Sequence, residues 1–306
     1  MKEWQKRALQ TFRGIQTAAD LPMAEVTSFK IGGPLDLWVA VENEAQLAQV
    51  LQFCRQENQP WFILGLGSNL LVRDGGIRGV GLKLAGDFAT WRPNREAGQV
   101  QITAGAGVIL ADLAKEAANQ GLSGLEFACG IPGSLGGAVF MNAGAYDSEM
   151  AQVLEKVQAY DPERGSIWYP KAELRLGYRF SIFQETQQVI TRAVLSPIPA
   201  DREAANAKVA DLTCRRAVKQ PLEMPSAGSV FRRPEGHYVG TMIEQAGLKG
   251  YAIGGAQVSP KHAGFIVNTG GATARDVLDL IAYVQRIIWE KFQVRLKTEI
   301  RVIGEE

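Results

Sequence analysis

The chain is 306 residues long, which exceeds the size at which one hydrophobic core normally stops growing, so two or three packed domains are expected. Hydrophobic residues at 46% and charged residues at 21% are typical of a globular protein, and a net charge of +1 provides no overall field for holding nucleic acid or an anionic membrane. The expected partner is therefore a small molecule, and neither a nucleic acid nor an obligate protein partner is indicated.

The cysteines and the apolar segments indicate the cellular compartment of the protein. Cys54, Cys129 and Cys214 are widely spaced and form no C-x-x-C pair, so neither a disulfide framework nor a zinc site is indicated. The first residues contain no apolar signal-peptide region, and no later segment offers the roughly 18 to 20 apolar residues that a membrane span needs. We expect a cytoplasmic protein that is neither exported nor membrane-spanning.

The first part of the chain predicts strands and helices separated by glycines. An apolar run predicts a strand over 35–41, and Asn43, followed by apolar residues at helical spacing, is typical of a helix N-cap. Further strands are expected over 61–64, 80–84, 100–104, 153–160 and 188–195. A helix over 109–120 should end at Gly121, because glycine is favoured just past a helix end.

The last third begins after two prolines near residue 200, where we place a domain boundary. Helices are predicted over 201–218 and 238–245, with a loop or strand edge between them. Thr273 and Asp276 have capping-box spacing at the start of a longer helix with one apolar stripe, which should be core. A final strand over 294–302 alternates between apolar and charged residues.

The first glycine-rich segment, Gly65-Leu66-Gly67-Ser68-Asn69-Leu70, follows a strand. Its small residues would let backbone N–H groups approach a pyrophosphate closely. It differs from the fingerprint of Rossmann folds, because Leu70 stands where a third glycine or an alanine is required. A plain glycine-rich turn is the alternative interpretation.

A second segment, residues 130–138, combines six small residues with Pro132 and leads into a possible helix start. Such a run can wrap an anion or a flat ring, or it can be a buried backbone crossing in which glycine is needed only sterically. Asn142, just beyond it, could contact a ring edge or act as a turn or cap residue.

Hydrolytic, metalloprotease and P-loop signatures do not occur. The chain contains no G-x-S-x-G, no H-E-x-x-H and no G-x-x-x-x-G-K-[ST], and its two histidines, His237 and His262, are not spaced as a ligand pair. Neither a serine triad nor a metal site is expected, and His262 is interpreted as a structural or substrate-edge residue.

Three polar side chains have both a functional and a simpler interpretation. Arg179 lies between aromatic residues, so partial burial would give its guanidinium a carboxylate or phosphate partner, and an internal ion pair is the commoner case. Ser229 lies next to a glycine, and serines in such positions mostly bond to backbone. Glu299 lies on the charged face of the predicted last strand, where a solvated charge ladder is the simpler interpretation.

Seven segments occur together in a recognisable order: TSFKIGGPLDLWV, GLGSNLLVRDGG, GLEFACGIPGSLGGAVFMNAGAY, GYRFSIF, PSAGSVFRRP, EQAGLKGYAIGGAQVSPKHAGFIVN and LKTEIRVIG. In this order the chain resembles the UDP-N-acetylenolpyruvoylglucosamine reductase family, from Thr27 to Gly304. The functional expectation rests on this resemblance and not on composition or periodicity.

The resemblance implies an α+β fold with a flavin-binding region of the vanillyl-alcohol-oxidase type over residues 1–200. Two α+β subdomains, roughly 1–85 and 86–200, would hold FAD between them, and residues 201–306 would form an α+β substrate domain. Members of this family use NADPH to reduce FAD and then reduce the enolpyruvyl ether of UDP-N-acetylglucosamine to UDP-N-acetylmuramate, a peptidoglycan precursor, by ping-pong kinetics. FAD should be bound without a covalent link, because neither histidine lies in the flavin-binding half.

Position in the matching segments assigns the binding residues. Those expected to contact the FAD pyrophosphate are Gly65, Gly67, Ser68 and Asn69. Those expected along the flavin are Gly130, Ile131, Gly133, Ser134, Gly136 and Gly137, with Asn142 as a further cofactor contact. Candidates for binding the substrate are Tyr178, Arg216, Arg232, Arg233 and Arg301, and a solvated surface position is the alternative for these arginines.

The resemblance also assigns three catalytic residues. Arg179 and Glu299 match the pair that polarises the enolpyruvyl carboxylate, and Ser229 matches the proton donor. Hydride addition at the terminal vinyl carbon leaves an enolate-like dianion, whose charge a guanidinium can stabilise and whose C-2 carbon needs a proton.

The chain resembles the shorter branch of the family, because residues 177–196 leave no room for an inserted loop whose tyrosine covers the nucleotide. Two alternatives remain open at this stage. One is an FAD-dependent oxidase of the same fold that acts on another small alcohol or sugar, and the other is a non-catalytic nucleotide-sugar binding protein.

Overall fold

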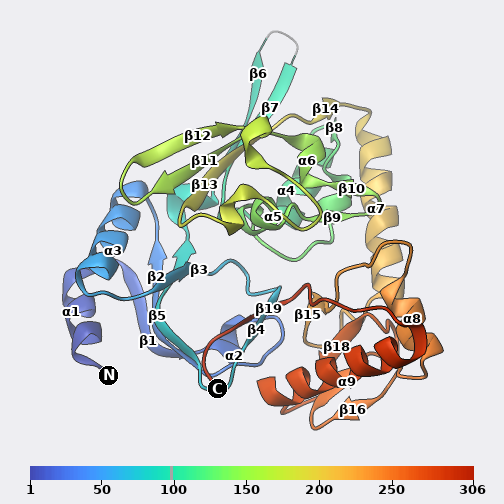
Figure 1. The fold of residues 1–306 in the computed structure, drawn as a ribbon. Helices are drawn as coiled ribbons and strands as arrows, with labels where there is room; N and C mark the ends of the chain where they lie inside the picture. Colours follow the sequence, from blue (N-terminus) through green and yellow to red (C-terminus); the bar gives the residue numbers. More distant parts are fainter. Residues whose placement is uncertain (97–98) are drawn as a thin grey trace.

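The computed structural model describes residues 1–96 and 99–306 and is organised by three sheets of four or five strands (Figure 1). The first sheet has the order β1-β2-β5-β3, in which β2, β5 and β3 run parallel and β1 is antiparallel to β2. Its strands are β1 (Gln16–Pro22), β2 (Pro34–Val41), β3 (Trp61–Ile63) and β5 (Ile77–Leu84). The helices of this part are α1 (Glu3–Thr11), α2 (Met23–Val26) and α3 (Glu44–Gln56).

The predicted start of α3 is confirmed. The Asn43 side chain accepts a hydrogen bond from the Gln46 backbone N–H at 3.0 Å, which satisfies one of the donors that a helix N-terminus leaves free. The apolar residues at helical spacing are buried against the sheet: Leu47, Val50, Leu51 and Cys54.

The second sheet, at the top of Figure 1, is antiparallel with the order β12-β11-β13-β7-β6. Its strands are β6 (Trp91–Glu96), β7 (Gln99–Gly105), β11 (Leu154–Asp161), β12 (Gly165–Pro170) and β13 (Val189–Leu195). Helix α4 (Leu110–Asn119) ends ahead of Gly121, whose φ is +69°, as predicted, and α5 (Leu135–Met141) packs on β13 and β7.

Short elements connect this sheet. They are η1 (Gly86–Ala89), β8 (Leu122–Ser123), η2 (Glu126–Ala128), β9 (Gly144–Ala145), β10 (Ser148–Glu149), α6 (Met150–Val153), η3 (Lys171–Leu174), η4 (Ile182–Gln184) and β14 (Ile198–Pro199).

Helix α7 (Arg202–Lys219) runs down the right side of Figure 1 and joins the upper part to the third sheet. This sheet is antiparallel with the order β15-β18-β17-β16. Its strands are β15 (Ser226–Ser229), β16 (Ala252–Ile253), β17 (Ala256–Val258) and β18 (Phe265–Asn268), and its helices are α8 (Val239–Gln245) and α9 (Ala274–Phe292). The capping box of α9 is confirmed, since Thr273 and Asp276 bond reciprocally at 3.1 and 3.0 Å.

The predicted last strand is wrong in its extent. Only β19 (Arg301–Ile303) forms, and it pairs in parallel with β4 (Leu70–Val72). The preceding residues lie along the edge of the third sheet, where Glu299 N donates to Val230 O at 2.7 Å. Because the segment changes partner at Ile300, it cannot form one continuous ladder, although its side chains still alternate.

Three hydrophobic clusters form the interior, and two of them combine residues from distant parts of the chain. Phe29, Ile31 and Leu71 from the first third pack in the same cluster as the apolar face of α9. Leu212 of α7 packs in the large cluster of the first two sheets. A division near residue 200 therefore stays a prediction.

Candidate functional site

A cavity of about 1730 Å³ lies between the first two sheets and reaches β15 and β19 of the C-terminal part. Pockets for drug-sized ligands measure about 300–1,000 Å³, so this cavity can hold something larger, such as a dinucleotide. Both glycine-rich segments line it, together with the end of α7. The cavity is therefore large enough for a ligand. It is lined by both glycine-rich segments, by the first two sheets and by the C-terminal part of the chain.

The two glycine-rich segments are joined to each other. Ser68 Oγ donates a hydrogen bond to the Pro132 carbonyl at 2.6 Å, and a Cβ on Gly65 would lie only 2.9 Å from Ser134 Oγ. Gly67 has φ of +61°, which a residue with a side chain rarely adopts, so it turns the first loop toward the cavity. The predicted pyrophosphate residues therefore lie beside the predicted flavin residues.

The second segment contains glycines of two kinds. A Cβ on Gly136 would lie 2.8 Å from Ala106 Cβ, and a Cβ on Gly130 would lie 2.6 Å from Arg216 Cδ, so these two glycines are required for packing. Gly137 has only Ser134 Oγ within ordinary contact at 3.5 Å, and it lines the cavity. The packing interpretation therefore applies to Gly136 and Gly130, and a ligand contact at Gly137 stays a prediction.

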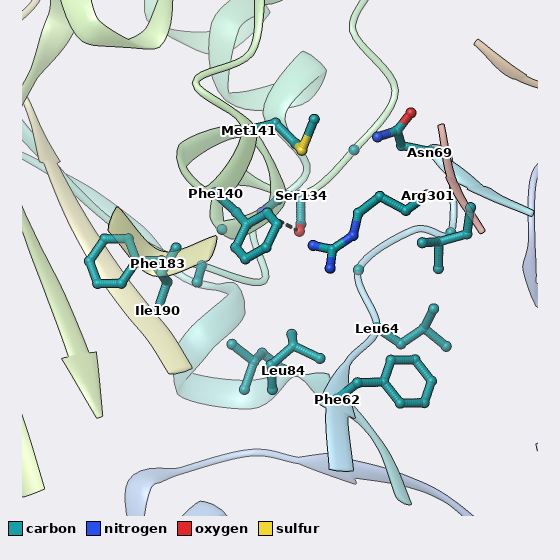
Figure 2. Close-up of a pocket in the computed structure, with 18 of the residues that line it drawn as sticks. Phe62, Leu64, Asn69, Leu84, Ser134, Phe140, Met141, Phe183, Ile190 and Arg301 are labelled. Atoms are coloured by element: carbon teal, nitrogen blue, oxygen red, sulfur yellow. Dashed lines mark hydrogen bonds between the residues drawn. The ribbon is translucent and has the colours of Figure 1, made fainter. Parts of the chain in front are cut away.

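Helix α5 begins at the cavity wall. The Ser134 side chain caps it by accepting a hydrogen bond from the Gly137 N–H at 3.3 Å (Figure 2). The next N–H groups are also bonded within the protein, since Leu135 N donates to Val108 O and Gly136 N donates to Ala106 O, both at 2.8 Å. The start of α5 is therefore fixed to the strand–helix connection beside the cavity.

Arg179 and Glu299 form an ion pair in the cavity wall. Arg179 Nε donates to Glu299 Oε1 at 2.7 Å, and the two side chains are 20% and 14% exposed. Arg179 lies in a two-residue turn closed by hydrogen bonds between Gly177 and Phe180, and its φ is +55°. The simpler interpretation of Glu299 as a solvated surface charge is wrong, because its side chain is mostly buried against the guanidinium.

Ser229 lies beside this pair. It ends β15, and its neighbour Val230 accepts the hydrogen bond from Glu299 N, so the two chain segments run side by side. The Ser229 side chain lines the cavity and is exposed to it. Within residues 1–96 and 99–306 its hydroxyl has no hydrogen-bond partner, unlike most loop serines, so it is available to a ligand.

Two arginines in the lining lack an acidic partner in the described part of the chain. Burial lowers the pKa of Arg216, and its Nε is buried without a hydrogen-bond partner there. Partial burial also lowers the pKa of Arg301, whose guanidinium lies 4.8 Å from the Phe140 ring centre and projects into the cavity (Figure 2). Guanidinium groups without an acidic partner favour anions, so these positions fit phosphate or carboxylate groups of a ligand.

Most predicted site residues line the cavity. Those that do are Gly65, Gly67, Ser68, Asn69, Ile131, Gly133, Ser134, Gly136, Gly137, Arg179, Arg216, Ser229, Glu299 and Arg301. Tyr178 lies just outside the lining, and its hydroxyl is 3.5 Å from Glu299 Oε2. Gly130, Arg232 and Arg233 are also outside, and Gly130 acts through the room it leaves for Arg216.

Asn142 caps a helix and supports a turn, and the cofactor contact expected of it stays a prediction. This residue ends α5 in the left-handed conformation, with φ of +41°, and its side chain is fully buried. Its Nδ2 donates to Gly177 O at 3.0 Å and its Oδ1 accepts from Ala151 N at 2.9 Å. The amide is therefore used by the protein, and Asn142 supports the turn that carries Arg179.

Sequence reasoning missed the apolar wall of the cavity. Its members come from several elements (Figure 2) and include Phe62, Leu64, Leu84, Phe140, Met141, Phe183 and Ile190. Apolar residues that face a cavity have the same pattern in a sequence as core residues, so no local signal separates them. Together with open glycines and partnerless arginines, this wall fits a ligand with a flat apolar ring system and a pyrophosphate, as FAD has.

His262 has a structural role, as expected. Its Nδ1 accepts a hydrogen bond from Gly264 N at 3.1 Å, burial lowers its pKa, and it does not line the cavity. In the described residues no group of three or more histidine, cysteine, aspartate or glutamate side chains could hold a metal ion. No helix in the same residues is long and apolar enough to cross a membrane.

The fold and site define a flavin-binding protein with a separate C-terminal domain. Residues 35–168 match the FAD binding domain family, and residues 220–303 match the family described as UDP-N-acetylenolpyruvoylglucosamine reductase, C-terminal domain. The expected α+β class, with an FAD-binding region ahead of this domain, is confirmed.

Whole-chain comparisons give the particular family. UDP-N-acetylenolpyruvoylglucosamine reductase of Clostridium perfringens (strain SM101) is 50% identical over 94% of this chain and 93% of its own length. The enzyme of that name from Syntrophomonas wolfei is 50% identical over 93% of this chain and 94% of its own length. The crystal structure of the Thermus caldophilus reductase covers 94% of this chain and 98% of its own at 35% identity, with a TM-score of 0.79. The chain belongs to the UDP-N-acetylenolpyruvoylglucosamine reductase family.

Proposed function

We propose that this protein reduces the enolpyruvyl ether of UDP-N-acetylglucosamine to UDP-N-acetylmuramate, with NADPH as electron donor and FAD as cofactor, in peptidoglycan precursor synthesis. The observation that carries the proposal is the Arg179–Glu299 ion pair beside the partnerless hydroxyl of Ser229, in a cavity shared with both glycine-rich segments. Membership of the reductase family supports the same assignment.

FAD, when bound, supplies hydride-transfer chemistry between NADPH and the vinyl carbon of the substrate. The residues that would hold it without a covalent link are Gly65, Gly67, Ser68, Asn69, Ile131, Gly133, Ser134 and Gly137. The small residues of both segments would let the backbone approach the cofactor closely, and the apolar wall would exclude water from the ring.

Arg179 would hold the carboxylate of the enolpyruvyl group. Its Nε is already bonded to Glu299, and its Nη2 donates to Gly144 O at 3.3 Å, so the plane of the guanidinium is fixed before the substrate arrives. When negative charge develops on the enolate-like product of hydride addition, a fixed cation stabilises it without reorganisation. Glu299 would keep Arg179 in this orientation.

Ser229 would donate the proton that completes the reduction. Its hydroxyl faces the same cavity as Arg179, and no protein group in the described residues competes for it. The O–H bond would break as the C-2 carbon of the substrate takes the proton, and the hydroxyl would be reprotonated from solvent. Positioning a general acid at this carbon accelerates such a step by roughly 10² to 10⁴.

The remaining basic residues are proposed to bind phosphates. Arg216 and Arg301 are the candidates that the geometry supports, since each points a partnerless guanidinium at the cavity in the described structure. Tyr178 and Arg232 lie outside the lining and are proposed as contacts with the outer part of the nucleotide sugar.

The visible spectrum of the purified protein tests the proposal most directly. We expect a flavin spectrum that bleaches on anaerobic addition of NADPH and recovers on addition of the enolpyruvyl substrate. A spectrum that recovers only with oxygen would favour an oxidase, and a colourless protein that FAD cannot reconstitute would favour a nucleotide-sugar binding protein.

A further inference from the structure

Tyr238 has a guanidinium on one face of its ring and solvent on the other. The Arg233 guanidinium lies 3.9 Å from the ring centre, whereas Tyr238 itself is 63% exposed. Within residues 1–96 and 99–306, no other aromatic ring or cation is stacked on this tyrosine. Nucleobases stack favourably on aromatic side chains, so an open tyrosine face of this kind can hold a base.

The loop that carries this pair is anchored at both ends. At its start, Arg232 N donates to Lys297 O at 2.8 Å, which ties the loop to the segment before β19. At its end, the chain enters α8 with Val239 buried. Between them, Arg233 Nε donates to His237 O at 3.3 Å, which holds the guanidinium over the ring. The open face of the tyrosine is therefore supported by the protein before any ligand arrives.

The loop lies beside the wall of the cavity that carries the ion pair. Arg233 N donates at 3.2 Å to the Tyr178 hydroxyl, and the same hydroxyl is 3.5 Å from Glu299 Oε2. The Arg179 guanidinium lies 4.9 Å from the centre of the Tyr178 ring. Because Tyr178 lies just outside the cavity lining, a molecule whose carboxylate is held by Arg179 can extend past Tyr178 to the stacked pair.

The charge of the pair also fits a nucleotide. Arg233 is exposed and forms no ion pair with an acidic side chain in the described part of the chain. Its Nε is bonded to a backbone carbonyl, which leaves the N–H groups of its two terminal nitrogens for phosphate oxygens. A nucleoside diphosphate carries a flat base on one side of its ribose and two phosphates on the other, so both halves of the pair have a counterpart in it.

A second groove, of about 360 Å³, adjoins the cavity and is the other route for the nucleotide. It shares Arg216 and Phe265 with the cavity lining, and it adds Leu222 and the carboxylate of Glu223. Phe265 is the one aromatic residue in the described lining of this groove, and it is only 4% exposed. The groove therefore offers no open ring for a base and places an acidic group near the phosphates.

We propose that Tyr238 closes over the nucleotide of the substrate by stacking its open face on the uracil, while Arg233 on the other face binds the diphosphate. A tyrosine of the C-terminal domain would then take the place of the inserted tyrosine loop that the sequence lacks. The inference rests on the proposed function, because its ligand is the UDP part of that substrate. Since Tyr238 lies outside the cavity lining, it would determine affinity for the nucleotide and not the rate of the chemistry.

The test titrates UDP into the FAD-loaded full chain by calorimetry and, separately, follows flavin reoxidation by the enolpyruvyl substrate. Tyr238→Ala removes the ring, and Tyr238→Phe keeps the ring without its hydroxyl. Trp289→Ala is the matched control, because Trp289 is also exposed and also lies under a guanidinium, that of Arg295 at 5.0 Å, but lines neither the cavity nor the groove. Leu222→Ala alters the second groove.

We expect Tyr238→Ala to weaken UDP binding roughly 5- to 150-fold, the range that stacking of one base on an aromatic side chain contributes. The KM of the enolpyruvyl substrate should rise by a similar factor while kcat changes less than about twofold, because a contact remote from the reacting carbon binds ground state and transition state equally. Tyr238→Phe should stay within about threefold of the parent protein, since the ring is retained. Both Trp289→Ala and Leu222→Ala should match the parent.

Unchanged UDP affinity in Tyr238→Ala would overturn the inference. Weaker binding in Leu222→Ala alone would overturn it in favour of the second groove, and an equal loss in Tyr238→Phe would assign the effect to the hydroxyl and exclude stacking. A parent protein that binds UDP but is not reoxidised by the enolpyruvyl substrate would instead overturn the proposed function. The UDP titrations of the variants would still decide the role of Tyr238 in that case.

Discussion

Arg179 combines an unusual backbone conformation with a fixed side chain. A residue with a side chain at φ of +55° carries roughly 1 kcal/mol or more of strain, which persists only where the surroundings determine it. Here the Gly177–Phe180 turn holds the backbone, and Gln184 Nε2 donates to the Arg179 carbonyl at 2.9 Å. This left-handed backbone conformation places the guanidinium against Glu299. A turn with an ordinary negative φ at this residue would point the side chain in another direction.

Arg179→Lys is expected to leave a folded, yellow protein that has lost most of its reduction of the enolpyruvyl substrate. An ammonium carries the charge but cannot hold Glu299, Gly144 O and a substrate carboxylate in one plane. Steady-state turnover together with the flavin spectrum measures this. Unchanged turnover would reduce the Arg179–Glu299 pair to a structural ion pair.

Ser229→Ala should separate the two half-reactions. Flavin reduction by NADPH needs no proton from this hydroxyl and should survive, whereas reoxidation by the enolpyruvyl substrate should slow by roughly 10² to 10⁴. Ser229→Cys should keep part of the activity, since a thiol can still deliver a proton from a slightly different position. Stopped-flow absorbance decides the matter, and equal slowing of both halves would make Ser229 a packing residue.

At the scale of elements, α5 contains one glycine required for packing and one glycine that lines the cavity. Gly136 and Gly137 are neighbours in its first turn, but a Cβ on Gly136 would lie 2.8 Å from Ala106 Cβ, whereas a Cβ on Gly137 would be at ordinary contact distance. The same substitution at each position therefore tests whether the open position is kept free for a cofactor.

Gly137→Ala should keep or raise the melting temperature, because alanine favours a helix by up to about 1 kcal/mol over glycine, and it should weaken FAD retention. Gly136→Ala should lower stability by roughly 1–3 kcal/mol through overpacking. Thermal unfolding of the apoproteins and FAD titration measure the two effects. Wild-type FAD affinity in Gly137→Ala would show that no cofactor atom approaches α5 here.

The elements differ in how far their sequences predict them. The starts of α3 and α9 are predictable because their caps are local: an asparagine, or a threonine with an acidic residue three positions on. Strand β12 was missed because it lies at a sheet edge with mixed burial, which leaves no clear alternation. The final strand was overextended because side-chain alternation does not reveal a change of pairing partner.

Site residues that belong to a recognisable sequence motif could be predicted. Site residues whose role depends on tertiary packing could not. The resemblance to a family located the glycine loops, Arg179, Ser229 and Glu299, which line one cavity. The partnerless state of Arg216 depends on packing between α7 and the second glycine segment, and no sequence pattern records that. Asn142 shows the converse, since its position in a motif suggested a ligand contact while its amide supports a turn.

On the scale of the whole molecule, the histidines and cysteines of the described residues support the expected non-covalent binding of FAD. Both histidines lie outside the cavity lining, and the one cysteine in the described lining, Cys54, is 1% exposed. Burial raises the pKa of the Cys54 thiol to about 12, so the reactive thiolate is disfavoured at any physiological pH.

Acid precipitation of the holoprotein should therefore release all of the yellow colour into the supernatant. The absorbance of the pellet after it is redissolved in denaturant provides the measurement. Flavin that stayed with the pellet, and that Cys54→Ala then released, would identify a covalent link and contradict the proposed mode of binding.

The β4–β19 pair also sets the order in which the molecule can be completed. Asn69 and Glu299, which this pair brings together, are 230 residues apart, and a ribosome makes the chain from its N-terminus. During synthesis β4 therefore has an unpaired edge until β19 is made, and the adjacent glycine loop lacks its contacts with the last strand. The cleft between the two sheets can begin to form on the nascent chain, but the wall that carries Glu299 and Arg301 closes only after β19 has emerged.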